Sequence, residues 1–137
     1  MKSAIHLAGA LLLALFASTV SAYAQPAIVK VKIPFDFTAS DMWMPAGEYT
    51  ITLRDKFLIL QTGSRKVLVL SYDDYAEAAS GSKLVFSHYG NESFLHEVIG
   101  HNTASLVLPG KAEKEARRRA IEAKLPSSGV PTIVAAQ

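Results

Sequence analysis

The sequence contains no cysteine. Disulfide bonds, thiolate catalysis, thiolate metal sites and a lipid anchor on cysteine are therefore excluded. The chain also lacks an excess of charge of one sign, because residues 25 to 137 hold 13 basic and 12 acidic side chains. This balance argues against a nucleic-acid-binding protein. A small domain of this composition must be stabilised by packing alone.

Catalytic and cofactor-binding motifs are also lacking. Ser80-Gly81-Ser82-Lys83 matches the S-x-x-K pattern of serine acyl-enzymes, but the S-D-N and K-T-G partners of that pattern are absent. Asp73-Asp74 is acidic, yet no D-x-D-x-D-G calcium loop surrounds it. We interpret both as turn residues and expect no catalytic residue, no cofactor and no metal.

The first 24 residues have the order of a secretory signal peptide. Lys2 precedes an apolar run from Ala4 to Phe16, and small residues end in Ala22-Tyr23-Ala24. The apolar run is shorter than the roughly 20 residues of a membrane span. We therefore predict cleavage after Ala24, no transmembrane span in the mature chain, and a periplasmic or secreted location; a retained membrane anchor is the alternative.

Alternating apolar and polar residues predict several strands between residues 25 and 110. The predicted strands cover 27–37, with an edge or a bend at Pro34, and 47–54, 57–61, 66–70, 83–89, 93–99 and 104–108. Residues 57–61 and 66–70 are apolar on both faces, so we expect both to be covered on both sides. The pattern predicts a mainly β fold, namely a small antiparallel barrel or sandwich of about six to seven strands.

A charged helix is predicted over residues 111–125, between Pro109-Gly110 and Pro126. Residues 126–137 are predicted to form a flexible tail, with a strand at 132–134 as the alternative. The helix carries Arg117, Arg118 and Arg119 in succession, which fan over a broad arc. These arginines are the candidate site for weak contact with an anionic envelope surface; the alternative is a solvated helix lying on the sheet.

Three histidines follow the signal segment: His88, His96 and His101. If the loop at Gly90 has three residues, His88 and His96 share one face of the hairpin that 83–89 and 93–99 form. Because no third ligand at a diagnostic spacing is visible, we interpret them as packed or rim histidines and predict no metal site.

Aromatic and methionine side chains suggest an apolar cavity as a second possibility. Trp43, Tyr72, Tyr75, Tyr89 and the methionines near Trp43 are the candidate lining residues. The simpler interpretation is that these residues fill the core.

Three short strings of sequence resemble a known group of proteins. They are Val31–Phe37 (VKIPFDF), Met44–Thr50 (MPAGEYT) and Lys83–Phe86 (KLVF) with Tyr89-Gly90 and Phe94-Leu95. Together they resemble a group of short exported bacterial proteins associated chiefly with acidobacteria, across most of the mature domain and through the charged helix. The resemblance implies an exported β domain. It assigns no functional residue, because the strings are strand and turn signatures.

These observations favour a non-enzymatic envelope or secreted domain that binds or scaffolds. The second hypothesis is a carrier of a small apolar ligand within the β domain. The third is a hydrolase at Ser80 and Lys83, or a metal-dependent enzyme at the histidines.

Overall fold

The structure is a computed structural model that describes residues 25–74, 81–125 and 131–137. The predicted signal segment therefore lies outside the described residues. The strands are β1 (Ile28–Ile33), β2 (Phe37–Ala39), β3 (Met42–Met44), β4 (Gly47–Arg54), β5 (Phe57–Thr62), β6 (Arg65–Asp74), β7 (Lys83–Tyr89), β8 (Glu92–Ile99), β9 (Ala104–Val107) and β10 (Thr132–Ala135). One helix, α2 (Lys111–Glu122), follows β9.

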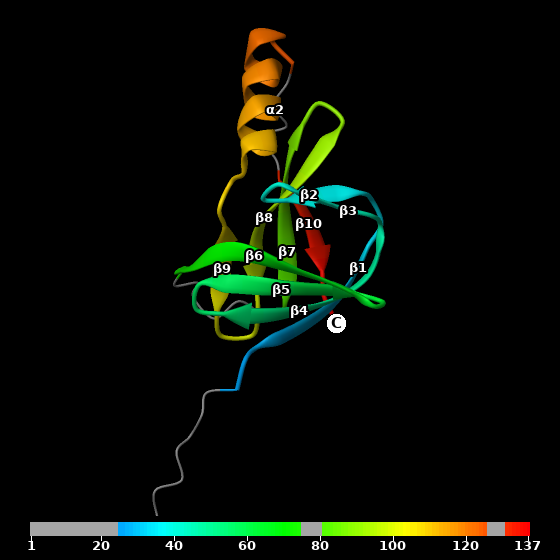
Figure 1. The fold of residues 1–137 in the computed structure, drawn as a ribbon, viewed down its shortest axis with the longest axis vertical. Coiled ribbons are helices and arrows are strands. Elements are labelled where there is room, and N and C mark those ends of the chain that lie inside the picture. The colour runs from blue at the N-terminus through cyan, green and yellow to red at the C-terminus, as the bar shows by residue number, and fades with distance from the viewer. Residues whose placement is uncertain (1–24, 75–80, 126–130) are drawn as a thin grey trace, which may run out of the picture.

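The strands form one curled sheet whose two halves share β6. The order along the main path is β1-β4-β5-β6-β9-β8-β2-β3, and β7 pairs with β8 on one side and β10 on the other. Arg65 to Leu70 of β6 pair with β5, whereas Ser71 to Asp74 pair with β9. In Figure 1, β4, β5 and β6 cross β7, β8 and β10 at a steep angle. The core lies between these two halves.

The mainly β fold with one C-terminal helix is confirmed, but the sheet is not a closed barrel. Among the described residues, β1 and β10 share no ladder; beyond the end of β10, Gln137 N donates a hydrogen bond to Lys30 O of β1 at 2.9 Å. One pairing is also parallel, that of β2 with β8 at Thr38 and Phe94. The barrel alternative is therefore wrong, and the arrangement is that of an open sheet folded over its own core.

The ten strands of the sheet exceed the predicted six to seven. The chain bends after β1 at Pro34, so the predicted strand 27–37 is divided between β1 and β2. The predicted loop 39–46 contains β3, which pairs with β2. Thr132–Ala135 pair with β7, so the flexible tail is wrong for these residues and the alternative, a strand, is present.

Aromatic side chains organise the centre of the core. The ring of Phe86 packs edge-on against Phe35 and Phe37, with ring centroids 5.0 and 5.4 Å apart. Phe37 also packs against the ring of Tyr49, whose hydroxyl donates a hydrogen bond to Pro45 O. Aromatic pairs of this geometry add stability beyond their buried area. These contacts join β2, β4 and β7 from opposite halves of the sheet.

The prediction that 66–70 is covered on both faces is wrong, whereas the outward residues of 57–61 are half-buried. Leu58, Leu60, Val67 and Val69 face the core and are buried. Leu68 and Leu70, on the opposite face of β6, are 59% and 58% exposed. The described helix lies at one end of the molecule and does not cover this face (Figure 1). The apolar residues of β6 are therefore covered on the inward face alone, among the described residues.

Helix α2 is held at the end of the sheet by its first turn. It begins after Gly110 and ends three residues before the predicted Leu125. Asp41, in the turn between β2 and β3, accepts a hydrogen bond from the backbone N–H of Ala112. Ala116, Ala120 and Glu113 are its buried residues. The few buried side chains of the helix are thus supplemented by a cap from a distant turn.

Candidate functional site

The outward face of β6 carries a row of exposed apolar side chains. Side chains of successive strand residues alternate between faces. Val67, Val69 and Ser71 therefore point into the core, where all three are buried. The outward residues, all exposed, are in order Lys66, Leu68, Leu70, Tyr72 and Asp74.

Neighbouring strands extend this apolar surface sideways. Leu68 pairs with Ile59 of β5, and Ile59 with Thr52 of β4. Leu70 pairs with Phe57 in the next row. On the other side of β6, Tyr72 pairs with Leu106 of β9, and Leu108 follows β9. We name the outward residues of β6 together with Phe57, Ile59, Leu106 and Leu108 the outer strand face.

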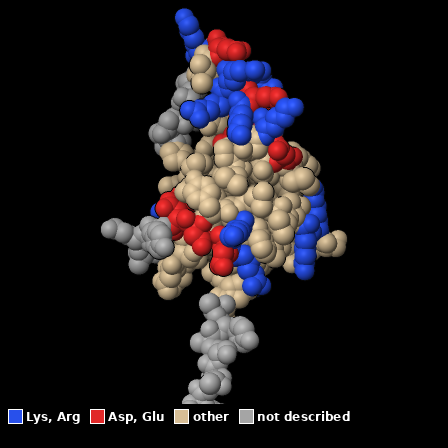
Figure 2. Space-filling model, turned by 60° about the vertical axis from the view of Figure 1, so that its left-hand side comes forward, with Lys and Arg blue, Asp and Glu red and all other residues tan. Residues whose placement is uncertain are grey.

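Four large apolar side chains of the outer strand face are exposed to solvent. Leu68, Leu70, Tyr72 and Leu108 are 59%, 58%, 50% and 42% exposed. Isolated exposed apolar residues are ordinary, whereas contiguous patches mark interaction sites. Figure 2 shows a broad uncharged area on one side of the molecule, between the charges of the helix and a group of charges at the opposite end.

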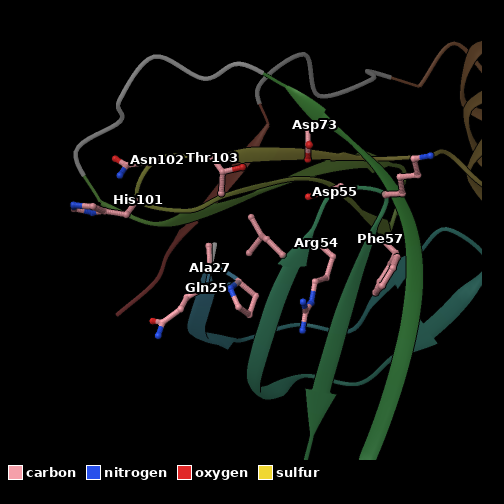
Figure 3. Close-up of a pocket in the computed structure, with 12 residues that line it drawn as sticks. Gln25, Ala27, Arg54, Asp55, Phe57, Asp73, His101, Asn102 and Thr103 are labelled. Carbon is pink, nitrogen blue, oxygen red and sulfur yellow. The ribbon is translucent and has the colours of Figure 1, made fainter. Parts of the chain in front are cut away.

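A second feature is an open cleft of about 800 Å³ at the end of the sheet distant from the helix. The backbone N–H of Leu53 bonds to Ala27 O, and that of Gly100 to Thr103 O, so a short segment and a tight turn form its walls. Its lining residues include Gln25, Ala27, Arg54, Asp55, Phe57, Asp73, His101, Asn102 and Thr103 (Figure 3).

The chemistry of the cleft favours no single class of ligand. Asp55 and Asp73 contribute acidic groups, while Arg54 and Lys56 contribute basic ones. Among the residues that the structure describes, no three His, Asp or Glu side chains are close enough to hold a metal ion. The cleft has charges of both signs on its walls and provides no recognisable constellation for catalysis.

His88 and His96 lie on opposite faces of the β7–β8 hairpin. The turn has two residues, Gly90 and Asn91, because Tyr89 pairs with Glu92, and this register places His88 opposite Ser93. His96 falls in the irregular part of the ladder and is exposed. The three-residue loop that would have brought the two imidazoles together is therefore wrong, and the pair cannot bind one ion from a shared face.

His88 joins three strands through two hydroxyl groups. Its Nδ1 is 2.9 Å from Ser93 Oγ and its Nε2 is 2.7 Å from Thr132 Oγ1. A serine beside an imidazole is the first element of an acyl-transfer site, but such sites orient the imidazole with a carboxylate. Here a threonine hydroxyl takes that place, and Phe35 packs against the ring. This arrangement is a polar link between β7, β8 and β10.

The aromatic residues considered for an apolar cavity do not surround one. Trp43 and Tyr72 are 56% and 50% exposed, and Met44 is buried in the core. Tyr89 packs against Phe94 on the hairpin. Tyr75 lies outside the described residues. The predicted lining is therefore wrong for the described members, which divide between the surface and the core.

The structure describes Asp73-Asp74 in full and the motif Ser80-Gly81-Ser82-Lys83 in part. Asp73 and Asp74 are the last residues of β6 and not turn residues. Lys83 begins β7, and Ser80 lies outside the described residues. The S-x-x-K pattern therefore cannot be evaluated as a pair.

Each of the three candidate arginines on α2 lies near an acidic residue. Arg119 Nη2 is 2.7 Å from Glu92 Oε2 on the hairpin, and Arg118 Nε is 3.8 Å from Glu122 Oε1. Arg117 interacts electrostatically with Glu113. All three arginines are exposed and therefore accessible, with acidic groups close to each of them. Glu92 lies 27 residues from Arg119, so no local spacing in the sequence indicates this pair.

Glu113 is the one acidic residue of the described chain that is buried, at 7% exposure. Burial raises the pKa of its carboxyl above the usual value, and the nearby His96 and Arg117 oppose this effect. The carboxyl lies under the helix, between α2 and the hairpin. It is one of the buried residues through which the helix packs.

Comparisons of the chain with protein-family models, curated proteins and solved structures gave no match. In the described part of the chain, no helix combines the length and the apolar character needed to cross a membrane.

Proposed function

We propose that this protein is an exported, non-enzymatic domain of the envelope or the secreted fraction, which binds or scaffolds another protein chain through the outer strand face. The observation that carries the proposal is the exposure of Leu68 and Leu70, each more than half accessible on adjacent outward positions of one strand. Exposing such side chains to water is unfavourable by about 1.5 to 3 kcal/mol each relative to burial. A partner that covers them recovers this free energy.

The export part of the proposal is supported by the amino-terminal sequence. Residues 1 to 24 have the n-region, apolar region and Ala-x-Ala ending of a signal peptide. The resemblance to short exported bacterial β proteins supports the same location. Intact-mass measurement of the exported chain tests it, with Gln25 as the expected first residue. A mass that includes residues 1 to 24 would contradict cleavage.

The two other hypotheses have less support. A carrier of an apolar ligand requires an interior cavity, whereas the inward side chains of both sheet halves pack into one buried cluster. An enzyme requires a nucleophile with an oriented base or a metal site, and the described residues offer only the His88 hydroxyl link. Native mass spectrometry of the purified protein distinguishes these hypotheses, because a bound lipid or metal would add a defined mass.

The binding proposal is tested by site-specific photo-crosslinking in the envelope. A photo-reactive amino acid replaces Leu68 in one variant and Glu115, exposed on the helix, in a control variant. We expect a cross-linked species from position 68 and none from position 115. Equal yields at the two positions, or no product from position 68, would overturn the assignment of the outer strand face.

Helix α2 offers a second, weaker contact, with an anionic envelope surface. Arg117, Arg118 and Arg119 are exposed on a helix at the end of the molecule (Figure 1). Each basic side chain near an anionic membrane contributes about 1 kcal/mol, and the neighbouring acids reduce that contribution. We propose weak binding that disappears at high salt.

Co-sedimentation with anionic vesicles tests this contact. The wild-type protein and a variant with all three arginines changed to glutamine are compared at low and high salt. Greater sedimentation of the wild type at low salt alone supports the contact. Equal sedimentation of the two proteins at low salt would leave the helix as a solvated structural element.

A further inference from the structure

The outward residues of β6 form a pattern with opposite charges at its two ends. Lys66 lies at one end and Asp74 at the other, and Leu68, Leu70 and Tyr72 lie between them. Leu70 is the middle residue of the five, two positions from Leu68 and two from Tyr72. A second copy of the row that runs in the opposite direction is therefore complementary in charge, because its Asp74 lies against Lys66 of the first copy.

Two such rows can meet face to face in only two simple symmetric ways. With a two-fold axis along the strand, the copies run in the same direction and Lys66 faces Lys66 of the other copy. With a two-fold axis that crosses β6 at Leu70 and lies between the faces, the copies run in opposite directions. Lys66 of each copy then faces Asp74 of the other, and like charges are separated.

We propose that the partner of the outer strand face is a second copy of this chain, bound antiparallel about a two-fold axis at Leu70. This inference rests on the proposed function, in which the same face is the binding surface. In the dimer Leu70 packs against Leu70 of the other chain, and Leu68 packs against Tyr72 of the other chain. Each interface contains two identical Lys66–Asp74 pairs, because symmetry repeats every contact.

The surrounding residues determine how strong this dimer is. Ile59 and Leu106 flank the row on the two neighbouring strands and widen the apolar contact. The two halves of the sheet that share β6 cross at a steep angle (Figure 1), so we expect a contact confined to a strip along β6 and smaller than the roughly 800 Å² per partner of a standard interface. We therefore expect a reversible dimer with a dissociation constant in the micromolar range.

One residue opposes the dimer in this orientation. Arg54 lies in the same row as Leu70 and Phe57, two strands away, and is exposed. The two-fold axis follows this row, so it brings Arg54 toward Arg54 of the other copy at the margin of the interface. This repulsion between like charges is a specific consequence of the antiparallel arrangement and can be tested separately.

Analytical ultracentrifugation of the exported protein, over a range of concentrations, measures the association. We expect a shift from monomer to dimer for the wild type. Leu70→Asp places a carboxylate on the symmetry axis and is expected to weaken association at least a hundredfold. Ile121→Asp is the matched control, because Ile121 is 65% exposed on the helix, outside this face, and its replacement should leave the dimer intact. Circular dichroism verifies that both variants are folded.

Charge reversal tests the orientation of the copies. Lys66→Asp and Asp74→Lys each convert two attractive pairs into repulsive ones, and we expect each to weaken the dimer about tenfold at low salt. The double variant restores opposite charges and is expected to return to within about threefold of the wild type. Arg54→Gln is expected to strengthen the dimer. Failure of the double variant to recover would overturn the antiparallel arrangement.

The outcomes separate this inference from the proposed function. A protein that stays monomeric up to about 1 mM would overturn self-association. If position 68 then still cross-links to a different protein, the proposed function stands without the dimer. If the protein dimerises but Leu70→Asp has no effect, the dimer uses another surface and the inference is wrong. A cross-linked product of twice the chain mass that forms from position 68 and not from position 115 supports both the proposed function and the dimer.

Discussion

The carboxylate of Asp41 accepts a hydrogen bond from the backbone N–H of Ala112, with Oδ1 3.0 Å from the nitrogen. The two residues are 71 positions apart in the sequence. Gly110, at the helix N-cap position, has no side chain to perform this role, and no side-chain cap comes from the helix itself. The turn between β2 and β3 therefore supplies the cap of α2 and fixes where the helix begins.

Asp41→Ala is expected to destabilise the protein by about 1 kcal/mol, because one N–H at the helix start loses its partner. Asp41→Asn should cost less, since the amide oxygen can still accept the bond. Chemical denaturation measures both. Equal losses for the two variants would indicate that the cap is not the source of the effect.

Gly110→Ala is expected to be more harmful. An added Cβ would lie 2.5 Å from the carbonyl group of Ser40 and from Asp41 Oδ1, too close without movement of the backbone. We expect a loss of about 2 kcal/mol or more. Gly100→Ala is the matched control, since its Cβ would meet its nearest atoms at 3.5 Å, an ordinary contact. A larger loss at Gly100 would contradict the close packing described for the helix start.

Glu113→Gln is expected to stabilise the protein at neutral pH and to change its stability little near pH 4. Burial raises the pKa of Glu113 from its usual 4.5 in the folded state, despite the opposing effects of His96 and Arg117. The folded protein then binds more protons than the unfolded chain, so this group reduces stability as pH rises through that range.

Thermal melting at several pH values measures the difference between wild type and Glu113→Gln. Glu115→Gln removes the same charge from an exposed position of the same helix and is the control. A gain in stability from Glu113→Gln that is as large at pH 4 as at pH 7 would exclude ionisation of the buried carboxyl as the cause.

Ser105→Ala is expected to leave stability unchanged or to raise it by about 1 kcal/mol. The Ser105 hydroxyl is buried and has no hydrogen-bond partner among the described residues, so its removal sacrifices no bond. Ser93→Ala is the contrasting control, because Ser93 Oγ bonds to His88; it should cost about 1 kcal/mol. A loss at Ser105 as large as that at Ser93 would point to an additional partner for the buried hydroxyl.

Local patterns were sufficient to predict most of the strands. The alternation in 47–54 and the Gly90 turn each depend on neighbouring residues, and both appear in the structure as β4 and the β7–β8 hairpin. The bend at Pro34 was also expected, because proline cannot donate to a ladder. The strand β3 and the separation of β2 from β1 are not indicated by the sequence, since three residues are too few to display a period.

Features that depend on distant residues could not be predicted. The Asp41 cap and the Arg119–Glu92 pair join segments far apart in sequence. The apolar run Lys66–Leu70, which forms part of the outer strand face, predicts a central strand covered on both sides. The same composition also fits a strand that is buried on one face and exposed on the other. Only the arrangement of the remaining elements distinguishes a strand covered on both faces from one covered on a single face.

The sharing of β6 between both halves of the sheet has a consequence for cooperativity. Its first part forms the ladder with β5 and its last part the ladder with β9, so neither half can open without disturbing a strand of the other. Hydrogen exchange should therefore report one common opening free energy for the central amides of β5 and β9. A domain with two independent sheets would exchange in two separate steps; here a single continuous strand makes the β domain one unfolding unit.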